Sequence, residues 1–228
     1  MSSLIMSEFR TYITGGDSIT IEHPKELDGG GTWMSVDFLD TLEKTYPNRK
    51  FNKALEWCSG PGFIGFELLA RQKCNEIDFM DLHIPALDNI KETIHKNNLS
   101  YNINCILADR IEQLPHKKYD LIVGNPPHYT EKLFPEQNSE ESEDSCRRTL
   151  DLDLDIHRNF FQEISNYLTD DGVILISETY YKRMQNNKLF EVGIHYHRLA
   201  PIIVQNGFHI TNLHSTDYLY YMVIEKNR

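Results

Sequence analysis

Short apolar runs alternate with amphipathic stretches along most of this chain, and that alternation constrains its fold more than any other feature. Strand-like runs occur at residues 53–58, 76–80, 103–108, 119–123, 173–177, 208–213 and 218–224. Helical patterns occur at residues 35–44, 64–72, 85–97, 157–168 and 195–205. Strands that alternate with helices predict an α/β fold with a mostly parallel, seven-stranded sheet flanked by helices. The last two strands have only a turn between them, so we expect an antiparallel C-terminal strand.

Composition narrows the class of protein. The 228 residues fit one domain, and 40% hydrophobic with 25% charged residues is typical of a soluble globular protein. A net charge of −11 argues mildly against a broad nucleic-acid surface, although a local basic patch stays compatible with it. The four cysteines form no CxxC pair, and no apolar run approaches about 18 residues, so we expect reduced thiols and no membrane-spanning helix. The N-terminus lacks signal-peptide features, which favours a cytoplasmic protein.

Two segments fall outside the alternating pattern. We expect residues 1–50 to form an N-terminal cover or substrate segment, followed by the main domain at residues 51–228. Residues 130–155 include an acidic, serine-rich run that is typical of a solvated loop or of a lid beside the substrate. The histidines at positions 195, 197, 209 and 214 lack the fixed spacing of a metal site, so we expect no metal ion.

A stiff corner follows the apolar run at residues 119–124. Asn125 precedes Pro126 and Pro127, neither of which has an N–H, and His128 comes next. Because a residue before proline is pushed out of the helical region, this corner is expected to present the Asn125 amide and free backbone carbonyls. The Asn125 side-chain oxygen and the Pro126 carbonyl can each accept one N–H bond from a planar nitrogen. We therefore predict that these four residues are catalytic.

A glycine-rich loop follows the strand at residues 53–58. Gly60, Gly62 and Gly65 match GxGxxG, a pattern in which missing side chains let the backbone approach a ligand closely. Asp81 ends the next strand, about 20 residues further on, where a carboxylate can accept two hydrogen bonds from ribose hydroxyls. This spacing predicts a nucleotide-type ligand at the head of the sheet.

Two enzyme classes share that arrangement: dinucleotide oxidoreductases and adenosylmethionine-dependent methyltransferases. Glu56, in the strand before the loop, can bind a cationic amino-acid ligand and adds nothing obvious for a pyrophosphate. The loop carries no basic residue for phosphates, although backbone N–H groups can serve them. Asp109, after the third strand, can cap the exocyclic amine of adenine. These features favour S-adenosyl-L-methionine, with an NAD-type oxidoreductase or a non-catalytic nucleotide-binding protein as alternatives.

The glycine loop, the two acids after the strands and the Asn-Pro-Pro corner together resemble the ordered motifs of class I S-adenosylmethionine-dependent methyltransferases, which have a Rossmann-like fold. The resemblance is to the methyltransferase small domain, a subset that includes release-factor glutamine methyltransferases and nucleic-acid amino-methyltransferases. It implies that Gly60 and Gly62 lie under the methionine part of the cofactor, Asp81 on its ribose and Asp109 at its adenine. The expected cofactor-binding residues are Glu56, Cys58, Gly60, Gly62, Asp81, Leu82, Asp109, Arg110 and Asn125.

His128 departs from the family pattern, in which the fourth corner residue is most often Tyr, Phe or Trp. An imidazole can stack on a planar substrate and can also titrate, so His128 either stacks or acts as a general base. The expected substrate-binding residues are His128, Tyr129 and Tyr180. The resemblance implies methyl transfer to an amide or amine nitrogen, and the one expected partner is this methyl acceptor. A protein glutamine-type side chain is the first candidate, and an RNA base amine or a small molecule is the alternative.

Overall fold

A computed structural model of the chain describes residues 6–12, 18–28, 31–130, 150–185 and 188–228. Its central sheet has the strand order β5-β4-β3-β6-β7-β10-β9, and β8 pairs with β7 outside that path. The strands are β3 Phe51–Trp57, β4 Cys74–Asp81, β5 Asn102–Leu107, β6 Tyr119–Gly124, β7 Leu168–Gln185, β8 Lys188–Gly193, β9 Phe208–Ser215 and β10 Leu219–Lys226. Pairing is parallel from β5 to β7, whereas β10 is antiparallel to both of its neighbours. The predicted mostly parallel sheet with an antiparallel C-terminal strand is confirmed, and β8 is an additional strand.

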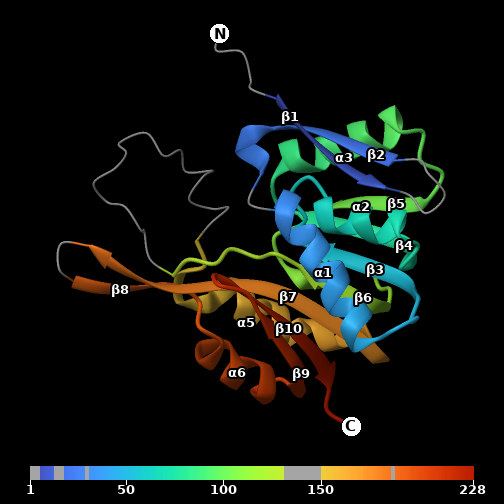
Figure 1. Cartoon of the computed structure of the whole chain (residues 1–228). Helices are drawn as coiled ribbons and strands as arrows, with labels where there is room; N and C mark the ends of the chain where they lie inside the picture. Colours follow the sequence, from blue (N-terminus) through green and yellow to red (C-terminus); the bar gives the residue numbers. More distant parts are fainter. Residues whose placement is uncertain (1–5, 13–17, 29–30, 131–149, 186–187) are drawn as a thin grey trace.

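Helices cover both faces of this sheet (Figure 1). The helices are α1 Gly31–Thr45, α2 Phe63–Ala70, α3 Ile84–Lys96, α5 Asp155–Glu163 and α6 Tyr196–Gln205, and short 3₁₀ turns are η1 Lys25–Leu27, η2 Ile111–Gln113, η3 Leu152–Leu154 and η4 Ile164–Asn166. Successive side chains of β6 point to opposite faces of the sheet. Leu121 and Val123 pack with α1 to α3, and Ile122 packs with α5 and α6. Among the described helices, none is long and apolar enough to span a membrane.

The first 50 residues contain a strand pair that the sequence pattern did not predict. Strands β1 (Met6–Tyr12) and β2 (Ser18–Pro24) pair antiparallel in a small sheet of their own. Ile19 and Ile21 are fully buried, and the ring of Phe9 meets the edge of Phe63, with ring centroids 5.3 Å apart. This small sheet therefore packs on the helical layer above β3 and β4. Helix α1 also begins at Gly31, four residues before the predicted start at residue 35.

The strands and helices predicted between residues 53 and 123 agree with the structure to within two residues at each end. The later part differs. The helix predicted for residues 157–168 spans Asp155–Glu163 and continues as the 3₁₀ turn η4. The Asp-Asp-Gly at residues 170–172, predicted to stop that helix, instead lies within β7, where the pairing with β6 shifts register. Strand β7 also runs past the predicted end at Ser177 and pairs with β8 beyond the helical layers (Figure 1).

Candidate functional site

The carboxyl ends of β4, β3 and β6 lie in one row, beside Ile176 within β7. Backbone pairing puts Met80 of β4 beside Trp57 of β3, Trp57 beside Gly124 of β6, and Gly124 beside Ile176 of β7. The next residues along these strands are Asp81, Cys58, Asn125 and Ser177. The glycine loop and the Asn-Pro-Pro corner thus leave adjacent strands at the same edge of the sheet, where ligands of parallel α/β folds bind.

The glycine loop is a turn that needs its glycines. Cys58, Gly60 and Gly62 have φ angles of 55°, 51° and 83°. A Cβ added to Gly62 would lie 2.8 Å from the Phe79 ring, and one added to Gly65 would overlap Phe79, so α2 can approach β4 closely only without these side chains. A Cβ on Gly60 would meet no described heavy atom within 4 Å, so the space over the loop is open to a ligand.

Asp81 ties the loop to the next strand. Its Oδ2 accepts a 2.7 Å hydrogen bond from the Gly60 N–H, and its Oδ1 accepts one of 2.8 Å from the His83 N–H. Burial raises the pKa of Asp81 above its ordinary value, and these N–H bonds work in the opposite direction. Since a carboxylate has about four lone-pair sites, each oxygen can still accept a further hydrogen bond from a ligand hydroxyl.

Glu56 lies under the loop with 2% of its surface exposed. Its Oε2 accepts a 2.7 Å hydrogen bond from the Gly65 N–H, in the first turn of α2. Burial, the largest effect, raises the pKa of Glu56 to about 8. A cation bound beside Glu56 would favour its charged form, which is the behaviour expected of a carboxylate that faces an ammonium group.

The outer side of the row carries three further expected cofactor residues. Leu82 follows β4, and Asp109 and Arg110 follow β5. Leu82 is 43% exposed, and Asp109 is exposed while its backbone N–H donates to Gln113 at 3.0 Å. The guanidinium of Arg110 lies 3.6 Å from the carboxylate of Asp155, in the first turn of α5. Leu82 and Asp109 therefore border the open ends of neighbouring strands, whereas Arg110 is held toward α5.

The Asn-Pro-Pro corner is anchored by a residue that sequence reasoning missed. Ser177 of β7 donates its hydroxyl hydrogen to Asn125 Oδ1 at 2.8 Å. Pro126 and Pro127 are buried, and Asn125 keeps an intermediate exposure. An amide oxygen has two lone pairs, so the bond from Ser177 fixes the orientation of the Asn125 amide and leaves one lone pair for another N–H.

His128 begins a chain of ionisable side chains that runs into the protein. Its Nδ1 lies 3.1 Å from Glu178 Oε2, and Glu178 Oε1 lies 2.7 Å from His157 Nε2. His157 Nδ1 in turn lies 2.5 Å from Asp151 Oδ2. Glu178, His157 and Asp151 are buried, whereas the His128 side chain is 14% exposed. These contacts form a buried hydrogen-bond network. Among the described residues, no group of three or more His, Cys, Asp or Glu is arranged to hold a metal ion.

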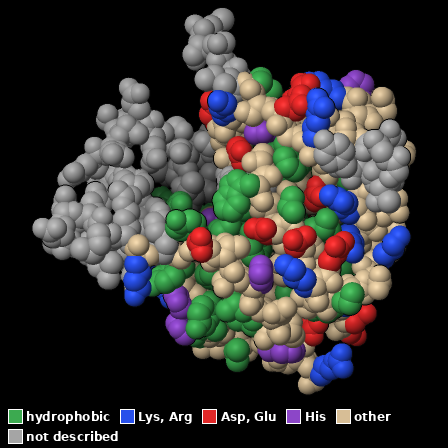
Figure 2. Space-filling view, viewed as in Figure 1, with side chains coloured by type: hydrophobic (Ala, Val, Ile, Leu, Met, Phe, Trp, Pro, Cys, Tyr) green, Lys and Arg blue, Asp and Glu red, His purple; other side chains and the backbone are tan. Residues whose placement is uncertain are grey.

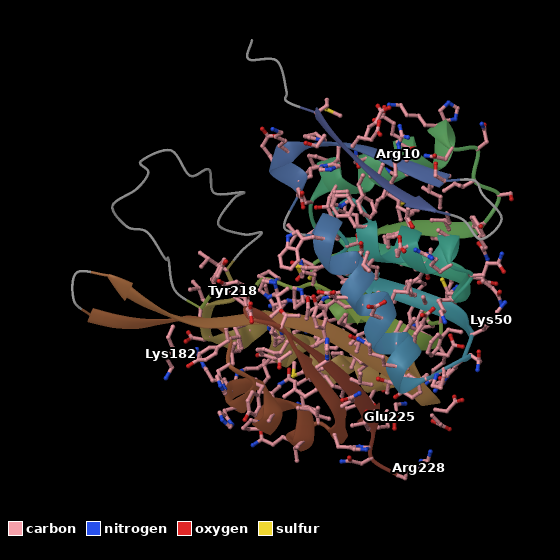
Figure 3. The ribbon with its side chains drawn as sticks, in the orientation of Figure 1. Arg10, Lys50, Lys182, Tyr218, Glu225 and Arg228 are labelled. Carbon is pink, nitrogen blue, oxygen red and sulfur yellow. The ribbon has the colours of Figure 1, made fainter. Side chains whose placement is uncertain are left out.

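The two expected substrate tyrosines occupy different places. The carbonyl of Tyr129 accepts a 2.7 Å hydrogen bond from the Asp151 N–H, and the Tyr129 ring lies edge-on to His128 with centroids 6.4 Å apart. Tyr180 instead meets the edge of the His195 ring, with centroids 4.2 Å apart. In Figure 3, the labels of Lys182 and Tyr218 show the part of the sheet near Tyr180. Lys50 is labelled on the opposite side of the molecule. The structure thus brings Tyr129 to the corner and Tyr180 to the start of α6.

Ser177, Glu178, His157 and Asp151 were not predicted as site residues. Ser177 and Glu178 had a usable signal, because they are polar residues directly after a strongly apolar run that ends a central strand. His157 stands within a helical pattern and has no comparable signal. Asp151 belongs to the segment at residues 130–155 that reads as a loop or lid. Residues 131–149 lie outside the described residues, but Asp151 itself is buried and hydrogen-bonded.

These residues fit S-adenosylmethionine as a ligand. The space over Gly60 is open, and Asp81 keeps lone pairs for ribose hydroxyls. Glu56 provides a buried carboxyl group for the charge of an amino-acid moiety. Leu82 offers an exposed apolar side chain after β4, and Asp109, the residue expected at the adenine amine, follows the neighbouring strand β5.

Comparison with known proteins agrees with this fit. The sequence matches the family described as "Methyltransferase small domain" over residues 26–139, which is half of the chain. A ribosomal protein uL3 glutamine methyltransferase of Francisella tularensis is 30% identical over 125 residues, which cover 54% of this chain and 40% of that protein. A bifunctional methyltransferase of Rickettsia bellii is 25% identical over 193 residues, 82% of this chain and 32% of that protein. The chain thus spans less than half the length of these curated relatives.

Solved structures show the same fold. A 16S rRNA methyltransferase of T. thermophilus, in complex with AdoMet and guanosine, superimposes with a TM-score of 0.63 at 16% identity, covering 99% of this chain and 51% of that one. An S-adenosylmethionine-dependent methyltransferase of Clostridium acetobutylicum gives a TM-score of 0.53 at 12% identity, covering 84% and 90% of the two chains. The predicted enzyme class and cofactor are those of the matched family, and this chain belongs to the methyltransferase small domain family of S-adenosylmethionine-dependent enzymes.

Proposed function

We propose that this chain transfers a methyl group from S-adenosylmethionine to a planar amide or amine nitrogen, and that a glutamine-type side chain of a protein is the acceptor. The observation that carries the proposal is the row of strand ends in which Cys58 and Asn125 follow paired residues of β3 and β6. The row places the glycine loop, where the cofactor is proposed to bind, next to the Asn-Pro-Pro corner, whose oxygens can accept N–H bonds. When bound, the cofactor supplies an electrophilic methyl group.

The corner's part in the reaction is positioning. The free lone pair of Asn125 Oδ1 and the Pro126 carbonyl each accept one N–H of the acceptor nitrogen, which fixes that nitrogen in one orientation. In favourable cases, orientation of this kind lowers the activation free energy by roughly 7–11 kcal/mol. The same two oxygens stabilise the positive charge that develops on nitrogen as it is alkylated. Neither proline can compete for them, since proline has no N–H.

The residues proposed to hold the cofactor come from the strand ends around the loop. Glu56 faces its ammonium group, Gly60 and Gly62 admit its methionine part, and Asp81 accepts from its ribose. Leu82 and Asp109 border the adenine. Cys58 lies at the start of the turn with a positive φ, and burial raises the pKa of its thiol well above the ordinary value, so it acts as a neutral packing residue.

Protein side chains are favoured over RNA as acceptors for two reasons. Relatives of 29–30% identity include ribosomal protein uL3 glutamine methyltransferases, whereas the rRNA methyltransferase supports the fold alone at 16% identity. The net charge is −11, and on the face shown in Figure 2 the acidic and basic side chains of the described residues are interspersed. A broad RNA surface is expected to gather Lys and Arg on one face.

We also propose that residues 1–50 cover the cofactor end of the site. His23, the penultimate residue of β2, packs edge-on against Phe63, with ring centroids 5.0 Å apart. Phe63 is the first residue of α2 and directly follows Gly62 of the glycine loop. The N-terminal strand pair therefore lies beside the start of α2, within reach of a ligand on the loop.

The proposal is tested by following a labelled methyl group. The purified protein is incubated with S-adenosylmethionine labelled in its methyl group and a cell extract, which is then separated into protein, RNA and small-molecule fractions. We expect label in the protein fraction, stable to base that cleaves methyl esters, and located on a glutamine side chain by mass spectrometry.

Calorimetry with the two cofactors tests the enzyme class separately from the identity of the acceptor. We expect S-adenosylmethionine to bind and NAD not to bind. Label in RNA would contradict the protein acceptor and leave nitrogen methylation in place, whereas binding of NAD without binding of S-adenosylmethionine would overturn the enzyme class.

A further inference from the structure

The buried network behind His128 is an unusual feature for the centre of a sheet. Glu178 and His157 have no exposed surface, and Asp151 has 1%. Transfer of an ion into a protein interior costs free energy, and well-packed apolar residues often replace such groups without loss of stability. Glu178 follows Ile176 and Ser177 on β7 and pairs with Tyr220 of β10, so an apolar residue would suit its position as well. A need for packing alone does not explain these three side chains.

The hydrogen bonds set where the protons lie. His157 has a carboxylate against each ring nitrogen, so both nitrogens donate and the ring is a cation. Burial lowers the pKa of His157, but the charge of Glu178 and the hydrogen bond to Asp151 outweigh it and raise this pKa to about 9. The second oxygen of Glu178 accepts from His128, so the Nδ1 of His128 carries a proton. The lone pair of neutral His128 is then on Nε2, where no hydrogen bond from a described residue reaches it.

The network ends at the site. His128 is three residues beyond Asn125, and two consecutive residues of β7 hold the two ends of the corner: Ser177 holds Asn125, and Glu178 holds His128. The same strand thus fixes the group that binds the acceptor nitrogen and the imidazole next to it. Among the described residues, Tyr129 is a further ionisable group whose ring lies beside His128. The Cys58 thiol lies close enough to Asp151 and Glu178 that their charges help to raise its pKa.

We propose that His128 is the proton acceptor of the methyl transfer, and that Glu178, His157 and Asp151 are positioning residues that hold it with Nε2 free. This inference rests on the proposed function. As the nitrogen gains its methyl group it must lose one proton: the electron pair of the N–H bond stays on nitrogen, and the proton binds the lone pair of Nε2. The imidazolium that forms is stabilised by the adjacent carboxylate of Glu178. A phenylalanine at this position could stack on the acceptor but could not take up the proton.

His128→Phe separates a base from a stacking ring, because phenylalanine keeps the planar contact and has no lone pair. With methyl-labelled S-adenosylmethionine and the acceptor identified by that labelling, we expect kcat to fall about 10²- to 10⁴-fold while the acceptor KM changes little. We also expect the acidic limb of the wild-type pH–kcat profile to disappear. Unchanged kcat and pH profile in His128→Phe would overturn the proposal.

Glu178→Gln tests the positioning residues, since His128 and His157 face different oxygens of Glu178 and glutamine replaces one of these acceptors by a donating NH₂ group. We expect kcat to fall at least tenfold, with cofactor affinity unchanged by calorimetry. The matched control is Glu92→Gln on the exposed side of α3, paired with Lys96, and it should leave kcat unchanged. Equal kcat values for Glu178→Gln and wild type would contradict the positioning role.

A third readout needs no turnover. Spectra of protein labelled with ¹⁵N in its histidine rings report which ring nitrogens carry protons. At neutral pH we expect the proton of neutral His128 on Nδ1 and protons on both nitrogens of His157, and we expect Glu178→Gln to alter both patterns. A proton on Nε2 of neutral His128 would overturn the inference whether or not the enzyme is active. Absence of methyl transfer by the wild-type protein would instead overturn the proposed function.

Discussion

The hydroxyl of Ser177 donates a 2.8 Å hydrogen bond to the side-chain oxygen of Asn125, across the boundary between β7 and the corner after β6. This bond orients the amide that is proposed to hold the acceptor nitrogen. Ser177→Ala removes the donor and leaves the backbone unchanged. One neutral hydrogen bond is worth about 1 kcal/mol, so we expect kcat to fall about fivefold. Steady-state kinetics measure this change.

The control for that change is Ser165→Ala in the 3₁₀ turn η4, which removes a hydroxyl away from the site. We expect Ser165→Ala to leave kcat unchanged, and both variants to bind S-adenosylmethionine as the wild type does. Equal effects of the two substitutions on kcat would show that Ser177 has no special relation to Asn125.

The placement of the candidate site residues at one edge of the sheet was predictable because several of them follow buried strands. Asp81, Cys58 and Asn125 each come directly after a run that is apolar enough to be recognised, and parallel strands bring their carboxyl ends to one edge. The strand pair β1 and β2 was missed because its apolar residues, such as Ile19 and Ile21, are few. Its burial depends on contacts with α2 and α3 that no local pattern reveals.

The buried network was not predictable for a related reason. His157 and Asp151 acquire their roles only when α5 packs against β7 and brings His157 within 2.7 Å of Glu178. Strand β7 was predicted too short because the polar residues after Ile176 break its apolar run. Those same residues, Ser177 and Glu178, are the ones that contact the corner. The polar residues that contact the corner therefore interrupt the apolar pattern at the position where the pattern predicted the strand to end.

Gly62→Ala should weaken both folding and cofactor binding. Gly62 has a φ of 83°, and a Cβ there would lie 2.8 Å from the Phe79 ring. The left-handed conformation alone costs an alanine roughly 1–2 kcal/mol, and the contact adds to that. Thermal unfolding and calorimetry with S-adenosylmethionine measure the two effects.

Gly207→Ala is the matched control, because Gly207 has the same φ of 83° and a Cβ there would meet nothing within 4 Å. We expect it to lower stability by the conformational cost alone and to leave cofactor affinity unchanged. If Gly62→Ala bound S-adenosylmethionine as tightly as Gly207→Ala does, the loop would not be the cofactor site.

The buried network predicts a loss of stability at alkaline pH. The pKa of His157 is raised from an ordinary 6.5 to about 9. The contribution of His157 to the free energy of unfolding is therefore fully present below about pH 6.5 and is lost as pH rises through 9. The pKa of Glu56, raised from 4.5 to about 8, acts in the same direction, since the folded state retains a proton that the unfolded state has released. The raised pKa of His157 contributes at most about 3 kcal/mol to the free energy of unfolding.

Thermal unfolding at pH 6.5, 7.5, 8.5 and 9.5 at constant ionic strength measures this loss. We expect Tm to fall steadily over that range. A Tm that stays constant or rises from pH 6.5 to 9.5 would be incompatible with a protonated His157 in the folded protein.

Asn125→Ala is the most direct test of nitrogen methylation at the corner. The measurement pairs kcat for labelled methyl transfer with the Kd of S-adenosylmethionine, beside Asn75→Ala at the exposed start of β4 as the matched control. We predict that Asn125→Ala lowers kcat by about 10²–10³-fold or more, as loss of a group that stabilises developing charge does, with a nearly unchanged cofactor Kd. Near-normal methyl transfer together with a collapse of cofactor affinity would contradict the assignment of Asn125 to the acceptor nitrogen.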